Sequence, residues 1–184
     1  MMVAFAMAAM ATSTSVSAAE SHVERVVHLD SAAAHYTLGG RVEILEDPAK
    51  NLLLSDVLEP SREGWVRSTQ EIPNFGLSSS AFWLRLSVKN QEAVSSDWLL
   101  EVGYHYLDAV DFAEVSENET IVHEPAGDLT PFTHRAFLHH NYIFPFSIEP
   151  GETRTLVVRV ESRQYCSDPA QSLHCGRSSA LRAK

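Results

Sequence analysis

The sequence predicts an all-β protein, an antiparallel β-sandwich, and two observations lead to this fold class. Apolar and polar residues alternate with a period of two in four separate segments, as in strands with one buried face. Turn-forming groups such as Gly39-Gly40 and Glu149-Pro150-Gly151 separate these segments. Short strands of this kind pack as two sheets face to face, and among such sandwiches we predict a jelly roll.

Four segments carry the clearest strand pattern, and every second residue in each is expected to face the core. They are Phe82 to Lys89, Trp98 to His105, Tyr142 to Ile148, and Leu156 to Val160. Weaker strands are predicted at 41–45, 65–70, 109–115 and 120–123, and a helical turn or two within 49–58. The predicted sandwich domain therefore covers residues 38–162, with residues 20–37 as an N-terminal lead-in.

Residues 1–19 are predicted to be a signal peptide. Val3 to Ala11 form a short apolar run, and the small residues Ser17-Ala18-Ala19 before Glu20 suit signal peptidase. The run is too short for a membrane-spanning helix. No Lys or Arg precedes it, so the alternative is a helical or disordered N-terminus. Cleavage would leave the mature chain in the periplasm or outside the cell.

The pattern changes after Ser162. Residues 163–184 lack strand alternation and hold four basic residues against one acidic residue, although the whole chain has a net charge of −10. We predict an atypical tail outside the sandwich, frameshifted or disordered; the alternative is an authentic flexible tail. Both cysteines, Cys166 and Cys175, lie here and either pair with each other or remain thiols.

The composition argues against several function classes. A net charge of −10 disfavours binding to nucleic acid and to anionic lipid, because both need a basic face. The Gly-x-Ser-x-Gly and Ser-x-x-Lys signatures of hydrolases are absent from the sequence, and so is a Gly-rich phosphate loop. We therefore expect neither an enzymatic activity nor a cofactor in this chain.

Histidines offer a candidate metal site. His134, His139 and His140 fall within seven residues, with His123 upstream, and imidazoles bind zinc or copper. Neighbouring residues on a strand point to opposite faces, so His139 and His140 are not expected to share an ion. A polar surface is the favoured interpretation, and no metal ligand is predicted.

Two sets of residues are candidates for binding a small polar ligand such as a sugar. Trp83 and Arg85 lie on the strand face opposite the apolar stripe. A second set, at a strand end and in a polar loop, comprises Tyr104, Arg135, His139 and Asn141. Aromatic rings stack on sugars, and Arg, His and Asn bind hydroxyls. The alternative for Trp83 is packing under a loop. We favour the second set, called the loop rim below, because loops carry recognition.

Five blocks of sequence together resemble a known family. The blocks are 81–86 with Asn90, 98–104 with Leu107-Asp108, 126–135, 139–146 and 150–162. From about His28 to Ser162 they resemble the type-two extracellular domain of bacterial seven-transmembrane receptors with diverse intracellular signalling modules. The chain departs from the family where His140 stands in place of a more usual Arg, and where the tail replaces the last sandwich strands.

The resemblance implies a periplasmic jelly roll similar to carbohydrate-binding modules. In the family, seven transmembrane helices and a diguanylate cyclase or histidine kinase follow this domain. We therefore expect the ligand-sensing part of such a receptor, with a carbohydrate or other small polar solute as partner, and a homodimer is left open. The alternatives are a free-standing secreted binding protein and a metal-binding periplasmic protein.

Overall fold

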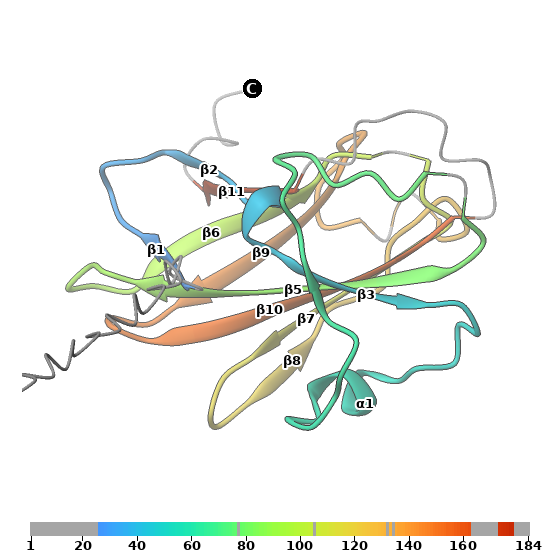
Figure 1. Cartoon of the computed structure of the whole chain (residues 1–184). Coiled ribbons are helices and arrows are strands. Elements are labelled where there is room, and N and C mark those ends of the chain that lie inside the picture. Colours follow the sequence, from blue (N-terminus) through green and yellow to red (C-terminus); the bar gives the residue numbers. More distant parts are fainter. Residues whose placement is uncertain are drawn as a thin grey trace, which may run out of the picture.

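The computed structural model describes residues 26–162, except 77, 105, 132 and 134, and residues 173–178. In this part of the chain two β-sheets lie one over the other, joined by loops and short helices (Figure 1). The segment predicted to be a signal peptide lies outside the described residues. No helix of the described part is long and apolar enough to cross a membrane.

The first sheet has seven strands in the order β4-β3-β5-β10-β7-β8, with β1 beside the far end of β5. Their bounds are β1 Val26–Leu29, β3 Glu43–Asp47, β4 Val66–Arg67, β5 Ala81–Asn90, β7 Ala109–Val115, β8 Thr120–Val122 and β10 Thr153–Glu161. Only β1 pairs with its neighbour in parallel; the other described pairs of this sheet are antiparallel.

The second sheet has four antiparallel strands in the order β2-β11-β6-β9. Their bounds are β2 His35–Thr37, β6 Ser96–Val102, β9 Tyr142–Ile148 and β11 Leu173–Arg177. The 3₁₀ helix η1 (Gly39–Arg41) follows β2, and the short helix α1 (Leu54–Leu58) follows β3. The prediction of an all-β antiparallel fold is confirmed, while the jelly-roll connectivity stays a prediction.

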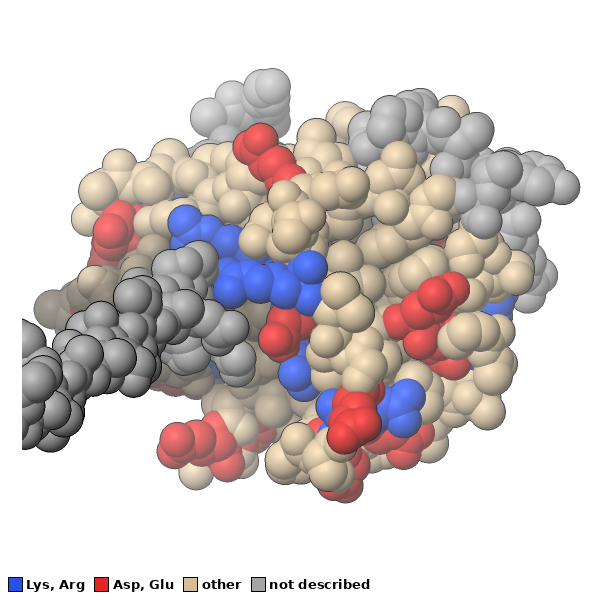
Figure 2. All heavy atoms as spheres, in the orientation of Figure 1, with Lys and Arg blue, Asp and Glu red and all other residues tan. Residues whose placement is uncertain are grey.

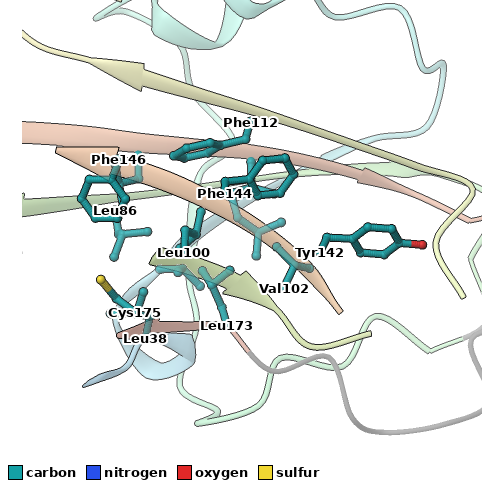
Figure 3. Close-up of a cluster of buried hydrophobic side chains, with 14 of the residues drawn as sticks. Leu38, Leu86, Leu100, Val102, Phe112, Tyr142, Phe144, Phe146, Leu173 and Cys175 are labelled. Carbon is teal, nitrogen blue, oxygen red and sulfur yellow. The ribbon is translucent and has the colours of Figure 1, made fainter. Parts of the chain in front are cut away.

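The core lies between the two sheets, where the alternating residues of the sequence meet. In the first sheet Leu84 pairs with Val158 and Leu86 with Leu156, and all four side chains are buried. In the second sheet the inward residues of β6 and β9 are also buried, and Figure 3 shows the phenylalanines beside the leucines of both sheets. Burying such a side chain stabilises a fold by about 1.5–3 kcal/mol.

Two predicted boundaries of the sandwich were wrong. The lead-in 20–37 contains β1 and β2, so the described sandwich begins at Val26. Val27 and Leu29 alternate into the core, but a four-residue strand gives too short a pattern to stand out in the sequence.

The boundary at Ser162 was wrong as well, because β11 belongs to the second sheet. It lies between β2 and β6, and Leu173 and Cys175 are buried in the core (Figure 3). The tail was expected to replace the last strands of the sandwich, whereas β11 supplies a strand beside β6. Cys175 is a free thiol, and burial raises its pKa. Cys166 lies outside the described residues.

The outer face of the first sheet is partly covered by the segment around α1. Val57 of the helix is buried against Leu45, Trp83 and Val157 of the sheet, in a second and smaller apolar cluster. Asp47 holds the approach to the helix, since its carboxylate accepts hydrogen bonds from the backbone N–H groups of residues 51 and 52. The packing of α1 on this face sets the shape of the candidate site.

Candidate functional site

Two cavities open on the outer face of the first sheet, one toward each end of α1. Leu54, at the start of the helix, lines one cavity, and Leu58, at its end, lines the other. Trp83 lines the first and Arg85 the second, so the two residues of β5 singled out in the sequence serve different cavities. We call them the Trp83 cavity and the arginine cavity.

The Trp83 cavity has an apolar base and polar sides. Its volume is about 410 Å³, which lies within the range of small-ligand sites. Trp83, Ala113 and Val157 of the sheet form the base, and residues 52–54 and Val122 add apolar walls. The polar lining residues are Lys50, Asn51, Asp111, His123 and Arg159. Trp83 is only 5% exposed, and its indole N–H has no hydrogen-bond partner among the described residues.

Ion pairs order the polar side of this cavity. Arg159 bridges two acids, with 3.0 Å from Nη2 to Glu161 Oε2 and 3.4 Å from Nη1 to Asp111 Oδ2. Lys50 Nζ lies 2.8 Å from Glu161 Oε1. The hydrogen bond from Lys50 lowers the pKa of Glu161, helped by Arg159 and opposed by burial. The Asp111 side chain stays 45% exposed, so this carboxylate keeps room to accept further hydrogen bonds.

His123 lines the cavity and is also part of a network of charged side chains with Glu114 and Arg154. Its Nε2 lies 2.7 Å from Glu114 Oε1, and Arg154 Nη1 lies 2.6 Å from the other oxygen of the same carboxylate. Burial lowers the pKa of Arg154, but its hydrogen bonds with Glu114 and Glu152 raise the pKa by more. The imidazole of His123 is thus held in place by a carboxylate that is itself paired.

The arginine cavity, of about 380 Å³, is lined by Arg41, Arg67 and Arg85 together with one acid, Glu43. Strand register explains the grouping, because Glu43 of β3 pairs with Arg67 on one side and with Arg85 on the other. Arg85 Nε donates to Glu43 Oε2 at 2.8 Å. Figure 2 shows a group of basic side chains near η1 and the start of β3, while other basic and acidic side chains alternate toward the lower and right edges of this face.

The loop-rim residues bind one another and the backbone. Arg135 Nη1 donates to the carbonyl of His139 at 3.1 Å, and its guanidinium lies 4.6 Å from the ring centroid of Tyr142. Asn141 donates from its backbone N–H to His139 Nδ1 and from its side chain to Glu101. Tyr104 is buried in the main core. The structure brings Arg135, His139 and Asn141 together, and neither cavity is lined by any of the four rim residues.

A tight loop supports this rim. Gly127 has φ of +135°, and a Cβ there would lie 2.2 Å from the carbonyl oxygen of Asp108. Only glycine permits that approach. The next residue, Asp128, accepts a hydrogen bond from the Tyr142 hydroxyl at 3.2 Å and lies 3.7 Å from Arg135.

The histidines do not follow the strand geometry expected of them. His139 and His140 lie in bends, not in a strand, and their ring centroids are 4.1 Å apart, so the expectation that they point to opposite faces was wrong. His134 lies outside the described residues. Within the described ranges no three His, Cys, Asp or Glu side chains are grouped as a metal site would require.

Sequence reasoning missed most of the cavity residues. Arg41, Arg67, Asp111 and Arg159 were not singled out, although Asp111 and Arg159 sit at outward positions of strands with apolar inner faces. That alternation was available from the sequence. The pairing of Arg159 with Asp111 and Trp83 across three strands was not, because it depends on register.

A family model of known proteins matches residues 39–171, and its description is 7TMR-DISM extracellular 2. The chain belongs to this family. It is accordingly an extracellular sensor domain of the seven-transmembrane receptor type, as the sequence blocks had indicated. The family match covers both cavities, since their lining residues fall between 41 and 159.

Comparison with other proteins adds little to the family match. No curated protein matches the chain. Among solved structures, the GH31 alpha-xylosidase from Xanthomonas citri aligns with a TM-score of 0.28 and 10% sequence identity. The alignment covers 74% of this chain and 16% of the xylosidase chain.

Proposed function

We propose that this sensor domain binds a small polar ligand, with a neutral carbohydrate as the favoured class, in the Trp83 cavity. The observation that carries the proposal is the combination of a tryptophan base with a charged, hydrogen-bonding side in one cavity of a sensor family. Apolar sugar faces pack on aromatic and aliphatic groups, while their hydroxyls need fixed donors and acceptors.

Individual groups of the cavity suit that role. Asp111 supplies an exposed carboxylate oxygen for a hydroxyl donor, and Arg159 and Lys50 supply donors for ring and hydroxyl oxygens. The indole N–H of Trp83 lacks a partner among the described residues, and a buried unpaired donor is costly. This N–H has almost no accessible surface, so Trp83 serves the cavity as its apolar base rather than as a donor to the ligand.

The loop rim of Tyr104, Arg135, His139 and Asn141 stays an alternative prediction for the ligand site. Its groups already serve as partners of one another, so a ligand there would have to replace internal hydrogen bonds. At the Trp83 cavity a ligand finds an existing space, and we therefore favour the outer sheet face with Trp83.

The wider receptor is also part of the proposal. After cleavage near Glu20, the domain would lie in the periplasm, attached to the inner membrane in a full-length receptor. Ligand binding would there regulate a diguanylate cyclase or a histidine kinase, the output modules implied by the family resemblance.

Calorimetric titration with a panel of neutral mono- and disaccharides tests the site. Asp111→Asn removes the charged acceptor and is expected to weaken binding roughly tenfold, as for a hydrogen bond to a charged group. The matched control is Asp97→Asn, an exposed aspartate of the second sheet, which is expected to leave binding unchanged.

Trp83→Phe keeps an aromatic ring but reduces the apolar base of the cavity, so it is expected to weaken binding with a limited loss of stability. Binding that is lost in Asn141→Ala and unchanged in Asp111→Asn would move the site to the loop rim. The carbohydrate assignment fails if no sugar of the panel binds at millimolar concentrations.

A further inference from the structure

The arginine cavity lies outside the proposed sugar site and has a different chemistry. Among the residues that the structure describes, it gathers three guanidinium groups, from η1, β4 and β5, and one carboxylate. The protein as a whole has a net charge of −10, so an excess of positive charge inside one cavity is contrary to its general composition. Such a local excess favours an anion as the occupant.

The backbone holds the first of these arginines in place. Gly39, at the start of η1, is buried, and a Cβ at this position would lie 2.0 Å from the carbonyl oxygen of Glu71. Glycine at this position thus lets the segment at Glu71 pack directly on η1. Arg41 ends η1, and its backbone N–H donates to the carbonyl of Leu38 at 2.8 Å. The Gly39-Gly40 pair, which has no phosphate-loop context, has this structural role.

The third arginine, Arg85, is ion-paired with Glu43, and basic side chains outnumber acidic ones in the described lining of the cavity. Glu43 is bound to Arg85, whose guanidinium also lies 4.0 Å from the ring centroid of Trp65. Counted over the described lining residues, three guanidinium groups and one carboxylate give a formal charge of +2. Arg41 and Arg67 both line this cavity and are exposed to solvent. In the sequence, Arg41 precedes Glu43 and Arg67 follows it.

The remaining lining groups select among anions. Ser87 and Thr155 place their hydroxyls 3.4 Å apart, and both can donate to or accept from a ligand. Glu43 accepts hydrogen bonds only, so it suits a ligand hydroxyl and repels additional negative charge. Leu58 and Val115 provide apolar walls. A singly charged carboxylate joined to several hydroxyls matches this set better than a multiply charged phosphate does.

We propose that the arginine cavity is a second ligand site, specific for a small hydroxylated carboxylate such as a sugar acid. The carboxylate binds the guanidinium groups of Arg41 and Arg67 through paired N–H donors. The ligand hydroxyls bind Ser87, Thr155 and Glu43. This site is independent of the proposed neutral-sugar site, and either can hold if the other fails.

Calorimetric titration of the full chain with galacturonate tests the proposal, with galactose as the neutral analogue of the same ring. Galacturonate is expected to bind at least tenfold more tightly than galactose in low salt, and to weaken as sodium chloride is added. Arg41→Gln and Arg67→Gln are each expected to weaken galacturonate binding about tenfold, because a charge-assisted hydrogen bond is lost.

Lys89→Gln is the matched control, since Lys89 lies on the same strand as Arg85 and does not line the cavity. This variant removes one positive charge and is expected to leave galacturonate binding unchanged. Thermal melting within a few degrees of the natural chain shows that the arginine variants remain folded. Equal binding of galactose and galacturonate, tighter binding of inorganic phosphate, or an equal loss in Lys89→Gln would each overturn the proposal.

Discussion

Replacing Leu173 by alanine tests whether β11 is part of the folded domain. Leu173 is 3% exposed and packs in the main core, from a strand that pairs with both β2 and β6. Leu→Ala changes at such positions cost about 2–5 kcal/mol, from lost transfer energy and the cavity that remains. Domains of 150–250 residues melt roughly 2–4 °C lower for each kcal/mol, so the melting temperature is expected to fall by about 4–20 °C.

Leu138→Ala is the matched control for this measurement. Leu138 is 79% exposed, and the same substitution there is expected to change stability by about 0.5 kcal/mol or less. Both variants are compared by thermal melting and by urea unfolding. If the two melt together at the temperature of the unmodified chain, β11 is not packed in solution, and the segment after Ser162 is a tail as the sequence had suggested.

Three further predictions concern groups that are buried or half-buried. In a Cys166→Ser background, Cys175 is expected to resist a thiol reagent in the native protein and to react in urea, because the thiol is buried and its pKa is raised. Burial, and then repulsion from His35, lowers the pKa of His174 below its ordinary 6.5. As the pH drops below 6.5, the imidazole of His174 is therefore protonated in the unfolded chain before it is protonated in the folded one. The free energy of unfolding is expected to fall over this pH range, and His174→Gln should make that fall with pH less steep. Glu114→Ala leaves Arg154 without its closest buried partner and is expected to cost about 3–5 kcal/mol in urea unfolding.

Controls and contrary outcomes are available for each of these. Rapid reaction of Cys175 without urea would show that β11 opens in the native state. His140→Gln, at an exposed position, is expected to keep the pH slope, and an unchanged slope in His174→Gln would remove His174 as its source. Glu117→Ala, at an exposed position, should leave the free energy of unfolding nearly unchanged. If Glu114→Ala changes it as little, the buried ion pairs of Glu114 do not stabilise the fold.

The arrangement of the inner faces was determined by the sequence alone. Leu84, Leu86 and Val88 face the core of the sandwich, as their spacing predicted, and the same holds for the inward residues of β6, β9 and β10. Alternation is a local property, since neighbouring side chains of an extended chain must point to opposite sides. For long strands, the sequence therefore predicts both that the segment is a strand and which of its faces is buried.

Pairing and register were decided only by the tertiary structure. β11 offers two buried residues, Leu173 and Cys175, and so short a pattern does not show that it inserts between β2 and β6. The sequence left Trp83 with two alternatives, packing or ligand binding, and the structure shows it buried beside α1 while it also lines a cavity. Both features depend on the position of α1, which lies earlier in the chain and packs on Trp83 only in the folded structure.

The arginine cavity makes the same point for function. Arg41, Arg67 and Arg85 are spread over forty-five positions of the chain and share no motif. They line one cavity because Glu43 of β3 pairs with both Arg67 and Arg85, and because Arg41 stands two residues before Glu43. A shift of either pairing by one residue would turn these side chains to the opposite face of the sheet. The sequence gives the three arginines, but their position in one cavity depends on the register between strands, which no local sequence pattern determines.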